Sequence, residues 1–259
     1  MERLLIINPN TTQSVSDKLD AIAKQVCGLD VQIRTVTASF GAPYIDSEAS
    51  YAIAAHATLE ALNAALQDDK TAPHSILIAC FGDPGLLALR ESTDIAVTGL
   101  AEAAFKEAAT FGRFAIVTGG ARWKPMLERH AHMLGFDAAL AGIHTVQPSG
   151  LQLAQDPEAA KILLAEACKT ALRDFNAQAV ILGGAGLAGM AASIQSNFDA
   201  PIVDSVLAGV RLAMHRASIA VFRLIFPVSC KIRAKFGSSR RIYCLYCYKI
   251  YSKINLLSN

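Results

Sequence analysis

The sequence predicts an α/β protein built on parallel sheet, and three observations carry this prediction. The 259 residues are 53% hydrophobic but only 7% aromatic, so Ala, Leu, Ile and Val must form most of the core. Short continuous apolar runs, typical of strands buried on both faces, alternate with helical segments of about 10–20 residues. Glycine-rich turns follow several of these runs, and two of the turns repeat one another along the chain.

The first half opens with the apolar run Leu4 to Ile7, which predicts a strand that ends in a polar turn. Thr11 or Thr12 is a suitable N-cap for the helix that follows, to about residue 27. An Ala-rich segment predicts another helix at 47–66, and Leu100 opens a further one. The predicted strands are 3–8, 31–37, 75–79 and 95–97, and the other helices run from the turn at 81–85 through 90 and over 100–109.

The second half repeats this alternation. The strand at 114–117 leads through Gly119 and Gly120 into a helix, and the strand at 179–182 leads into a glycine-rich turn at 183–186. The remaining predicted elements are a strand near 143, a strand at 201–203, helices at 125–134 and 156–175, a short helix after 186 and a closing helix from about 205. Strands joined by helices in this way predict βαβ units.

The two halves resemble one another in sequence. Residues 75–82 match 179–186, which pairs Cys80 with Gly184, and residues 5–9 match 115–119, which pairs Asn8 with Thr118. Two related halves that face each other would bring four strand-to-helix turns around one cleft. Ligands of open α/β sheets bind at the carboxyl ends of strands. The repeat therefore predicts a first lobe of residues 1–97 completed by 205–217, a second lobe of 98–204, and a site between them.

The charge distribution separates a C-terminal tail from this body. Residues 1–204 contain all 22 acidic residues and 14 of the 24 Lys and Arg, whereas 205–259 contain the other 10 and no acidic residue. The basic, Tyr-rich segment 218–259 could contact nucleic acid or an anionic membrane, or it could be a non-native ending such as a shifted reading frame. We favour the latter, and so expect neither nucleic acid nor membrane as a partner.

The cysteines and histidines predict no metal site and a reducing compartment. Cys244 and Cys247 have the spacing of half a zinc site, but the tail adds only Cys230. His130 and His132 are two residues apart and do not share a helical face. The first 200 residues show no disulfide framework, and neither a leader peptide nor a run of about 18 apolar residues is seen. We therefore expect a cytoplasmic protein.

Three motifs carry a family resemblance. Residues 7–11 read Ile-Asn-Pro-Asn-Thr, residues 79–86 read Ala-Cys-Phe-Gly-Asp-Pro-Gly-Leu, and residues 181–189 are glycine-rich. Together they resemble the signatures of hydantoin and allantoin racemases, in the aspartate/glutamate/hydantoin racemase family, over about residues 1–215. The resemblance implies two Rossmann-like lobes related by a pseudo-twofold axis, with the cleft between them. It also implies cofactor-independent chemistry, with one cysteine from each half flanking the substrate Cα.

The first of these cysteines corresponds to Cys80, but the position of the second is occupied by Gly184. In the family, one thiolate removes the α-proton while the opposite thiol delivers another. Single-cysteine relatives decarboxylate arylmalonates, although they retain the second cysteine and not the first. The resemblance therefore leaves three functions open: a racemase or epimerase of an amino acid or hydantoin-like substrate, a one-base decarboxylase or isomerase, and a catalytically silent small-molecule-binding protein.

Cys80 is the predicted catalytic residue. It precedes a turn that opens a helix, and helix N-terminal amides can lower a thiol pKa from about 8.5 to about 3.5–7.5. Asp83 and Asp204 each follow a strand and are expected to cap the helices after them. A homo-oligomer is left open. The predicted substrate-binding residues are Asn8, Asn10, Thr11, Phe81, Gly82, Thr118, Gly119, Gly184, Ala185 and Gly186.

Overall fold

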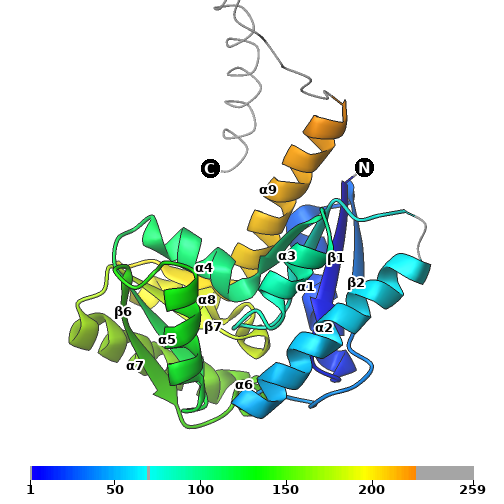
Figure 1. Ribbon diagram of the computed structural model, residues 1–259. Coiled ribbons are helices and arrows are strands. Elements are labelled where there is room, and N and C mark those ends of the chain that lie inside the picture. Colours follow the sequence, from blue (N-terminus) through cyan, green and yellow to red (C-terminus); the bar gives the residue numbers. More distant parts are fainter. Residues whose placement is uncertain (1, 69–70, 226–259) are drawn as a thin grey trace, which may run out of the picture. The chain divides into compact units, whose positions relative to one another are not determined.

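The computed structural model describes residues 2–68 and 71–225, and it contains two four-stranded parallel sheets (Figure 1). The first sheet has the order β2-β1-β3-β4 and the second the order β6-β5-β7-β8. The strands are β1 Glu2–Asn8, β2 Val31–Thr37, β3 Ser75–Ile78, β4 Ala96–Gly99, β5 Phe114–Gly119, β6 Leu140–Val146, β7 Ala179–Gly183 and β8 Ile202–Asp204. The predicted α/β class with parallel sheets is confirmed.

The helices fall close to their predicted positions, with one exception. The capping box formed by Ser149 and Gln152 starts a short helix, α6, that the sequence reading did not include. The helices are α1 Gln13–Cys27, α2 Glu48–Asp68, α3 Leu86–Ser92, α4 Leu100–Ala109, α5 Trp123–Met133, α6 Gly150–Gln155, α7 Pro157–Phe175, α8 Met190–Ile194 and α9 Ser205–Ile225, with single 3₁₀ turns at Ala185–Leu187 and Gln195–Asn197.

The strand order is the same in both sheets, so the sequence repeat is also a structural one. In each sheet, the first strand along the chain lies between the second and the third. Thr118 of β5 pairs with Gly183 of β7, as Ile7 of β1 pairs with Ile78 of β3. The turns after β1, β3, β5 and β7 therefore lie at the carboxyl edges of central strands, where a ligand site is expected.

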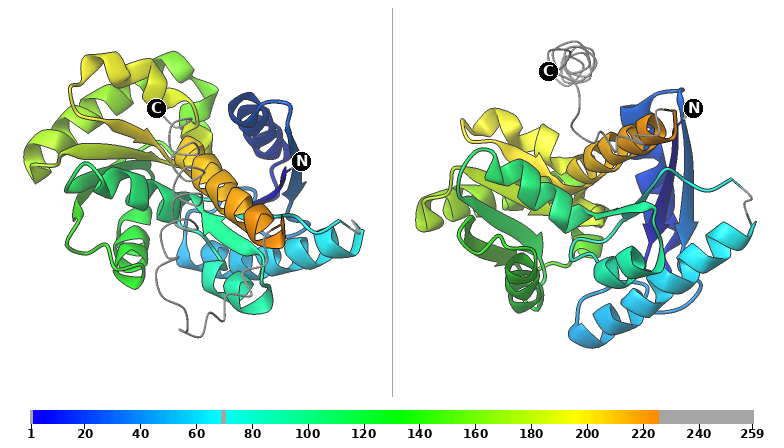
Figure 2. Two further views of the ribbon diagram at one scale, coloured as in Figure 1. Left: turned by 90° about the horizontal axis from the view of Figure 1, so that it is seen from above. Right: turned by 45° about the horizontal axis from the view of Figure 1, so that its top comes forward.

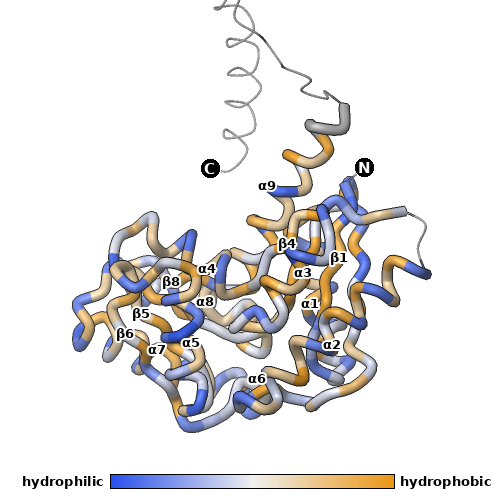
Figure 3. The backbone as a smooth tube through the Cα atoms, in the orientation of Figure 1, coloured by the Kyte–Doolittle hydropathy of each residue, from blue (hydrophilic) through white to orange (hydrophobic). Residues whose placement is uncertain are grey.

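One hydrophobic core joins the two sheets. Leu4 and Ile6 of β1 belong to the same buried cluster as Phe114 and Ile116 of β5, with Phe105 of α4 among them. The alternate residues of β1 face the other way and pack under α2 and α3, while those of β5 pack under α7. Figure 3 shows the hydrophobic colour along β1. Since both faces of each sheet are covered, the strands read as continuous apolar runs.

Helix α9 leaves the second sheet and packs against the first (Figures 1 and 2). A Cβ at Gly209 would lie 2.6 Å from Leu100 Cδ2 and 3.1 Å from Leu77 Cδ1, so only glycine permits this approach. Ser218 Oγ donates to Glu2 Oε1 at 2.8 Å. The sequence predicted that this helix ends near residue 217, but it continues to Ile225. The residues up to Leu224 form one compact unit. The lobe boundaries remain a prediction.

The proposals made for the basic tail concern residues 226–259, which lie outside the described part of the chain. Within the described ranges, every helix is too short or too polar to cross a membrane.

A buried carboxylate links α9 to the first sheet. Glu102 of α4 accepts from Arg90 at 2.6 Å, Lys106 at 2.7 Å and Arg216 at 3.0 Å, and its side chain is 5% exposed. Burial would raise the pKa of Glu102, but the hydrogen bonds and charges of Arg216, Lys106 and Arg90 lower it to about 2. Arg216 also donates to the Val97 carbonyl of β4 at 2.7 Å. This network holds the closing helix against the edge of the sheet.

We expect the ion pairs of Glu102 to make the free energy of unfolding decrease at acid pH. A carboxyl whose folded pKa is below its usual 4.5 stabilises the fold above that pH and loses this contribution as pH falls toward about 2. Glu102→Gln should lower the free energy of unfolding at neutral pH by roughly 3 kcal/mol, at about 1.36 kcal/mol per pKa unit. Urea unfolding at several pH values should show the deficit shrinking below pH 4.5. The exposed Glu91 provides the control Glu91→Gln, and an equal deficit in both variants would contradict the prediction.

Candidate functional site

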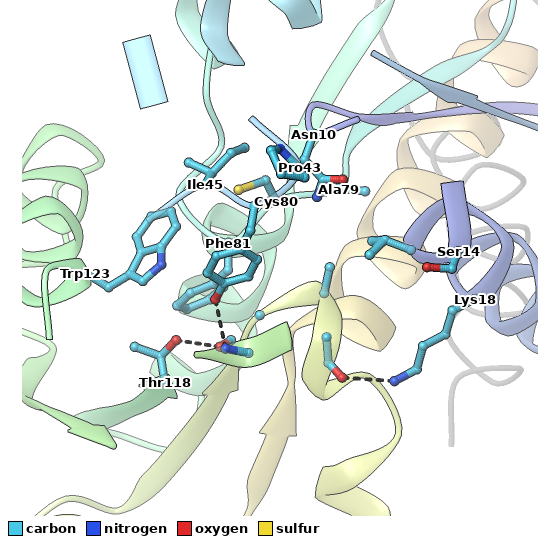
Figure 4. A pocket seen from close by; sticks show the side chains of 17 residues that line it. Asn10, Ser14, Lys18, Pro43, Ile45, Ala79, Cys80, Phe81, Thr118 and Trp123 are labelled. Carbon is cyan, nitrogen blue, oxygen red and sulfur yellow. Dashed lines mark hydrogen bonds between the residues drawn. The ribbon is translucent and has the colours of Figure 1, made fainter. Parts of the chain in front are cut away.

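The carboxyl edges of the two sheets enclose a small pocket (Figure 4). Its walls come from the turn after β3, the loop after β7, helix α1, the segment at 43–45 and the starts of α5 and α6. The cavity has about 140 Å³, far above the roughly 15 Å³ that one water needs, so a small molecule fits. The part of the chain that the structure describes contains no cluster of three metal-ligating side chains.

The structure brings most of the predicted site residues into this wall. The ones that line it come from the turns after β1 and β3, from the end of β5 and from the loop after β7; they are Asn10, Cys80, Phe81, Thr118, Gly184, Ala185 and Gly186. Cys80 and Gly184, which the repeat pairs, thus contribute to one cavity. Their roles in binding and catalysis stay predictions.

Four predicted residues lie behind the pocket wall and not in it. Asn8 is fully buried, and its Nδ2 donates to Asn10 Oδ1 and Ser16 Oγ, both at 3.0 Å. Thr11 N donates to the Ala42 carbonyl at 3.2 Å. A Cβ at Gly82 would meet the Trp123 ring at 2.7 Å, and one at Gly119 would meet the Pro148 carbonyl at 2.5 Å. These four residues position the lining residues by hydrogen bonding and close packing.

The turn that carries Cys80 has a backbone that few sequences can adopt. Gly82, Asp83 and Gly85 have φ of 141°, 53° and 84°, in the region that favours glycine. Asp83 N donates to the Cys80 carbonyl at 3.0 Å, and Tyr51 of α2 donates from its hydroxyl to the Gly82 carbonyl at 2.9 Å. Cys80 is therefore held in a fixed place two residues beyond the end of β3.

Asp83 caps a different helix from the one predicted. Its carboxylate accepts from Ala101 N and Glu102 N, both at 2.8 Å, at the start of α4 and not of α3. His130 Nε2 lies 3.0 Å from Asp83 Oδ2, and both side chains are buried. The reason is steric, because Gly99 before α4 has no side chain: a Cβ there would lie 2.0 Å from Asp83 Cγ. Asp204 does cap the helix that follows it, accepting from Val206 N and Leu207 N of α9.

We expect Asp83→Ala to be strongly destabilising. The change leaves two α4 amides and His130 without their buried partner, so the free energy of unfolding should fall by about 3 kcal/mol, the lower end for breaking a buried pair. Guanidinium unfolding measures the loss. Asp94→Ala removes an exposed aspartate and should leave stability nearly unchanged. A similar small effect in both variants would show that the capping interaction is unimportant.

The prediction that a helix N-terminus lowers the pKa of Cys80 is wrong. Helix α3 begins only at Leu86, and the turn between them carries the Asp83 carboxylate. The Cys80 side chain is 8% exposed. Burial raises the pKa of its thiol well above the ordinary value, and the negative charge of Asp83 raises it further. The resting group is therefore a protonated thiol, which acts as a base only when its proton has a nearby acceptor.

The loop after β7 forms the facing wall. A Cβ at Gly183 would lie 2.2 Å from the Phe81 ring, so the Cys80 turn packs directly on this loop. Thr118 Oγ1 donates to the Gly183 carbonyl at 2.7 Å. Gly184 has φ of 138°, and a Cβ there would meet only Leu187, at 3.8 Å. Position 184 thus has space for a side chain, but a backbone that L-residues rarely adopt.

The sequence reading missed the residues that other elements bring to the pocket. Ser14 and Lys18 are four apart and share one face of α1, a spacing that could have indicated them. Lys18 Nζ donates to the Gly186 carbonyl at 3.0 Å. Tyr44 comes from the segment after β2, and its hydroxyl accepts from Gly150 N at 2.9 Å across the pocket. Trp123 of α5 completes the apolar wall.

The protein is of the two-lobed α/β class: two parallel-sheet halves of the same topology meet at a pocket lined by a cysteine at the end of a strand. Comparison with known proteins gives the family. Residues 4–213 match the profile of the family described as Asp/Glu/Hydantoin racemase. The chain belongs to the Asp/Glu/hydantoin racemase family, as its motifs predicted.

Individual relatives agree with this assignment. Hydantoin racemase from Pseudomonas sp. (strain NS671) is 34% identical over 212 residues, 82% of this chain and 84% of that protein. Hydantoin racemase from Paenarthrobacter aurescens is 32% identical over 219 residues, 82% of this chain and 89% of that protein. The structure of allantoin racemase from Klebsiella pneumoniae has a TM-score of 0.79 and 31% identity, covering 85% of this chain and 89% of its own. These relatives are isomerases.

Proposed function

We propose that the chain is a cofactor-independent racemase of a small hydantoin-like substrate, with Cys80 exchanging the Cα proton. The observation that carries this proposal is the place of Cys80, at a strand end in the wall of a pocket that fits a small molecule. The hydantoin and allantoin racemases among the relatives favour a cyclic ureide over a free amino acid. In such a ring, Cα–H is acidified by the neighbouring carbonyl.

The pocket residues suit this chemistry. A thiolate at Cys80 removes the proton from Cα, and the C–H electron pair passes to the carbonyl oxygen as an enolate. Asn10 Oδ1 is occupied by Thr12 N at 2.9 Å and Asn8 Nδ2 at 3.0 Å, so the Asn10 amide N–H groups are available as donors to such an oxygen. Phe81 and Trp123 provide flat apolar walls for a planar ring.

The rival function within the same fold is a one-base decarboxylation or isomerisation, and Gly184 favours it because a second thiol is missing. A catalytically silent binding protein is the third outcome. Incubating pure enantiomers of a 5-substituted hydantoin, allantoin and an amino acid in heavy water distinguishes them. Deuterium at Cα with inversion supports a racemase, and deuterium without inversion a one-base enzyme. Binding without exchange, measured by calorimetry, would overturn the proposal.

A further inference from the structure

Resting on the proposed function, we infer that Lys18 is the second acid–base group of the site, delivering a proton to the face of Cα opposite Cys80. In this chain a lysine on α1 would then transfer the proton that Gly184, which has no side chain, cannot transfer. The inference concerns the catalytic machinery of the same pocket.

The position of Lys18 supports this role. Its Nζ lies 3.0 Å from the Gly186 carbonyl, two residues from Gly184, so the amine stands beside the loop from which a second thiol would project. Figure 4 shows Cys80 and Lys18 on opposite sides of the pocket, with the Lys18 side chain reaching toward the glycine-rich loop. Among the described residues that line the cavity, Lys18 is the only one with a formal charge at neutral pH.

The surroundings of Lys18 let it gain and release a proton. Burial lowers the pKa of Lys18, and the charge of Asp204 opposes this effect. Asp204 itself is held by the amides of Gly189, at 2.7 Å, and Val206, at 2.9 Å, so it is fixed near Lys18 without being its direct partner. A lysine whose pKa is lowered in this way gives up its proton more readily than an exposed lysine, which suits it to acid–base catalysis.

In each direction one of the two groups removes a proton from Cα and the other delivers one, so the number of protons is conserved. In one direction, the Cys80 thiolate takes the Cα proton, an S–H bond forms, and the C–H pair becomes the enolate. The Lys18 ammonium then gives a proton to the other face, its N–H pair staying on nitrogen. In the reverse direction, the neutral Lys18 amine removes the proton and the Cys80 thiol delivers one. Burial lowers the pKa of Lys18 and raises the pKa of Cys80, so it favours the neutral amine and the thiol with which this second direction begins.

Tyr44 is another titratable group among the described residues that line the pocket, and it suits the role less well. Its hydroxyl already accepts from Gly150 N, and burial raises the pKa of its phenol. Burial thus disfavours the phenolate that would have to act as the base in the reverse direction. A racemase needs both steps on each face.

Lys18→Met tests the inference with single enantiomers of a hydantoin in heavy water. We expect racemisation to fall by about 10²–10⁴-fold, the usual contribution of one acid–base group, while one enantiomer still exchanges its α-proton without inversion at Cys80. Lys18→Arg keeps the positive charge but cannot release a proton, so it should be equally impaired. Lys24→Met is the matched control on α1, because Lys24 is exposed and pairs with Asp20.

Each outcome decides the question. Undiminished racemisation by Lys18→Met overturns the inference, and full rescue by Lys18→Arg shows that Lys18 supplies only charge. Exchange without inversion by the parent protein also overturns it, while leaving Cys80 as a base. If the parent neither exchanges nor inverts any of these substrates, the proposed function itself fails, and the Lys18 variants behave like the parent.

Discussion

Replacing Cys80 with serine is expected to lower racemisation of both enantiomers by about 10²–10⁴-fold, together with α-proton exchange of the enantiomer whose Cα–H faces Cys80. The hydroxyl of serine is a far weaker acid than a thiol and cannot supply a base at neutral pH. Inversion should fail from either enantiomer, because Cys80 removes the proton in one direction and delivers it in the other, whereas the enantiomer whose Cα–H faces Lys18 can still exchange there. Chiral chromatography follows inversion, and proton NMR in heavy water follows exchange.

The substitution is mild for the fold, which makes the measurement interpretable. Sγ and Oγ are similar in size, and Cys80 stands in a turn fixed by Asp83 and Tyr51, not by its own thiol. Cys27→Ser is the control, because Cys27 is half-buried at the end of α1 and lies outside the pocket. A Cys80→Ser variant that keeps α-proton exchange of both enantiomers, or keeps inversion, would remove Cys80 from the mechanism, whatever its stability.

Local patterns predicted the fold because each strand carries its own signal. Leu4 to Ile7 or Ala179 to Leu182 must be buried on both faces, and such a run is recognisable without knowledge of its neighbours. The short helix α6 was missed because six residues are too few to show a helical periodicity. It is stabilised locally, by the capping box of Ser149 and Gln152, and by its place beside the pocket.

The sequence predicted only those residues of the candidate site that lie in or near turns following strands. Cys80 and Gly184 lie at such turns, and the repeat related them. Lys18 and Tyr44 reach the pocket from a helix face and a long connection, which the sequence does not place relative to the sheets. Which helix Asp83 caps likewise depends on tertiary packing. Two helices follow Asp83, and only packing against Gly99 shows which one it caps.

The electrostatic prediction for Cys80 failed because burial was not included. Sequence alone places a helix after the turn at 81–85, but it does not show the exposure of the thiol. In the structure, desolvation and the Asp83 charge act together to raise the pKa of Cys80.

Adding Gly184→Cys to the Lys18→Met variant is expected to restore racemisation by about 10²-fold, the lower end for one acid–base group. The new thiol would project from the same loop whose Gly186 carbonyl binds Lys18, in the pocket that Cys80 also lines. In the parent protein the gain should be smaller, because Lys18 already serves that face. Inversion rates of the four proteins, with and without each change, measure this interaction.

The backbone at position 184 sets the cost of this rescue. A φ of 138° is nearly restricted to glycine, so any side chain should destabilise the protein by about 1–3 kcal/mol unless the loop relaxes. Gly184→Ala in the Lys18→Met background carries the same strain without a thiol, and is the control for it. If the cysteine variant is as folded as the alanine variant by circular dichroism but gains no inversion, the two walls do not face opposite sides of Cα. If only cysteine restores it, a proton donor was what the loop lacked, because strain and space are the same in both.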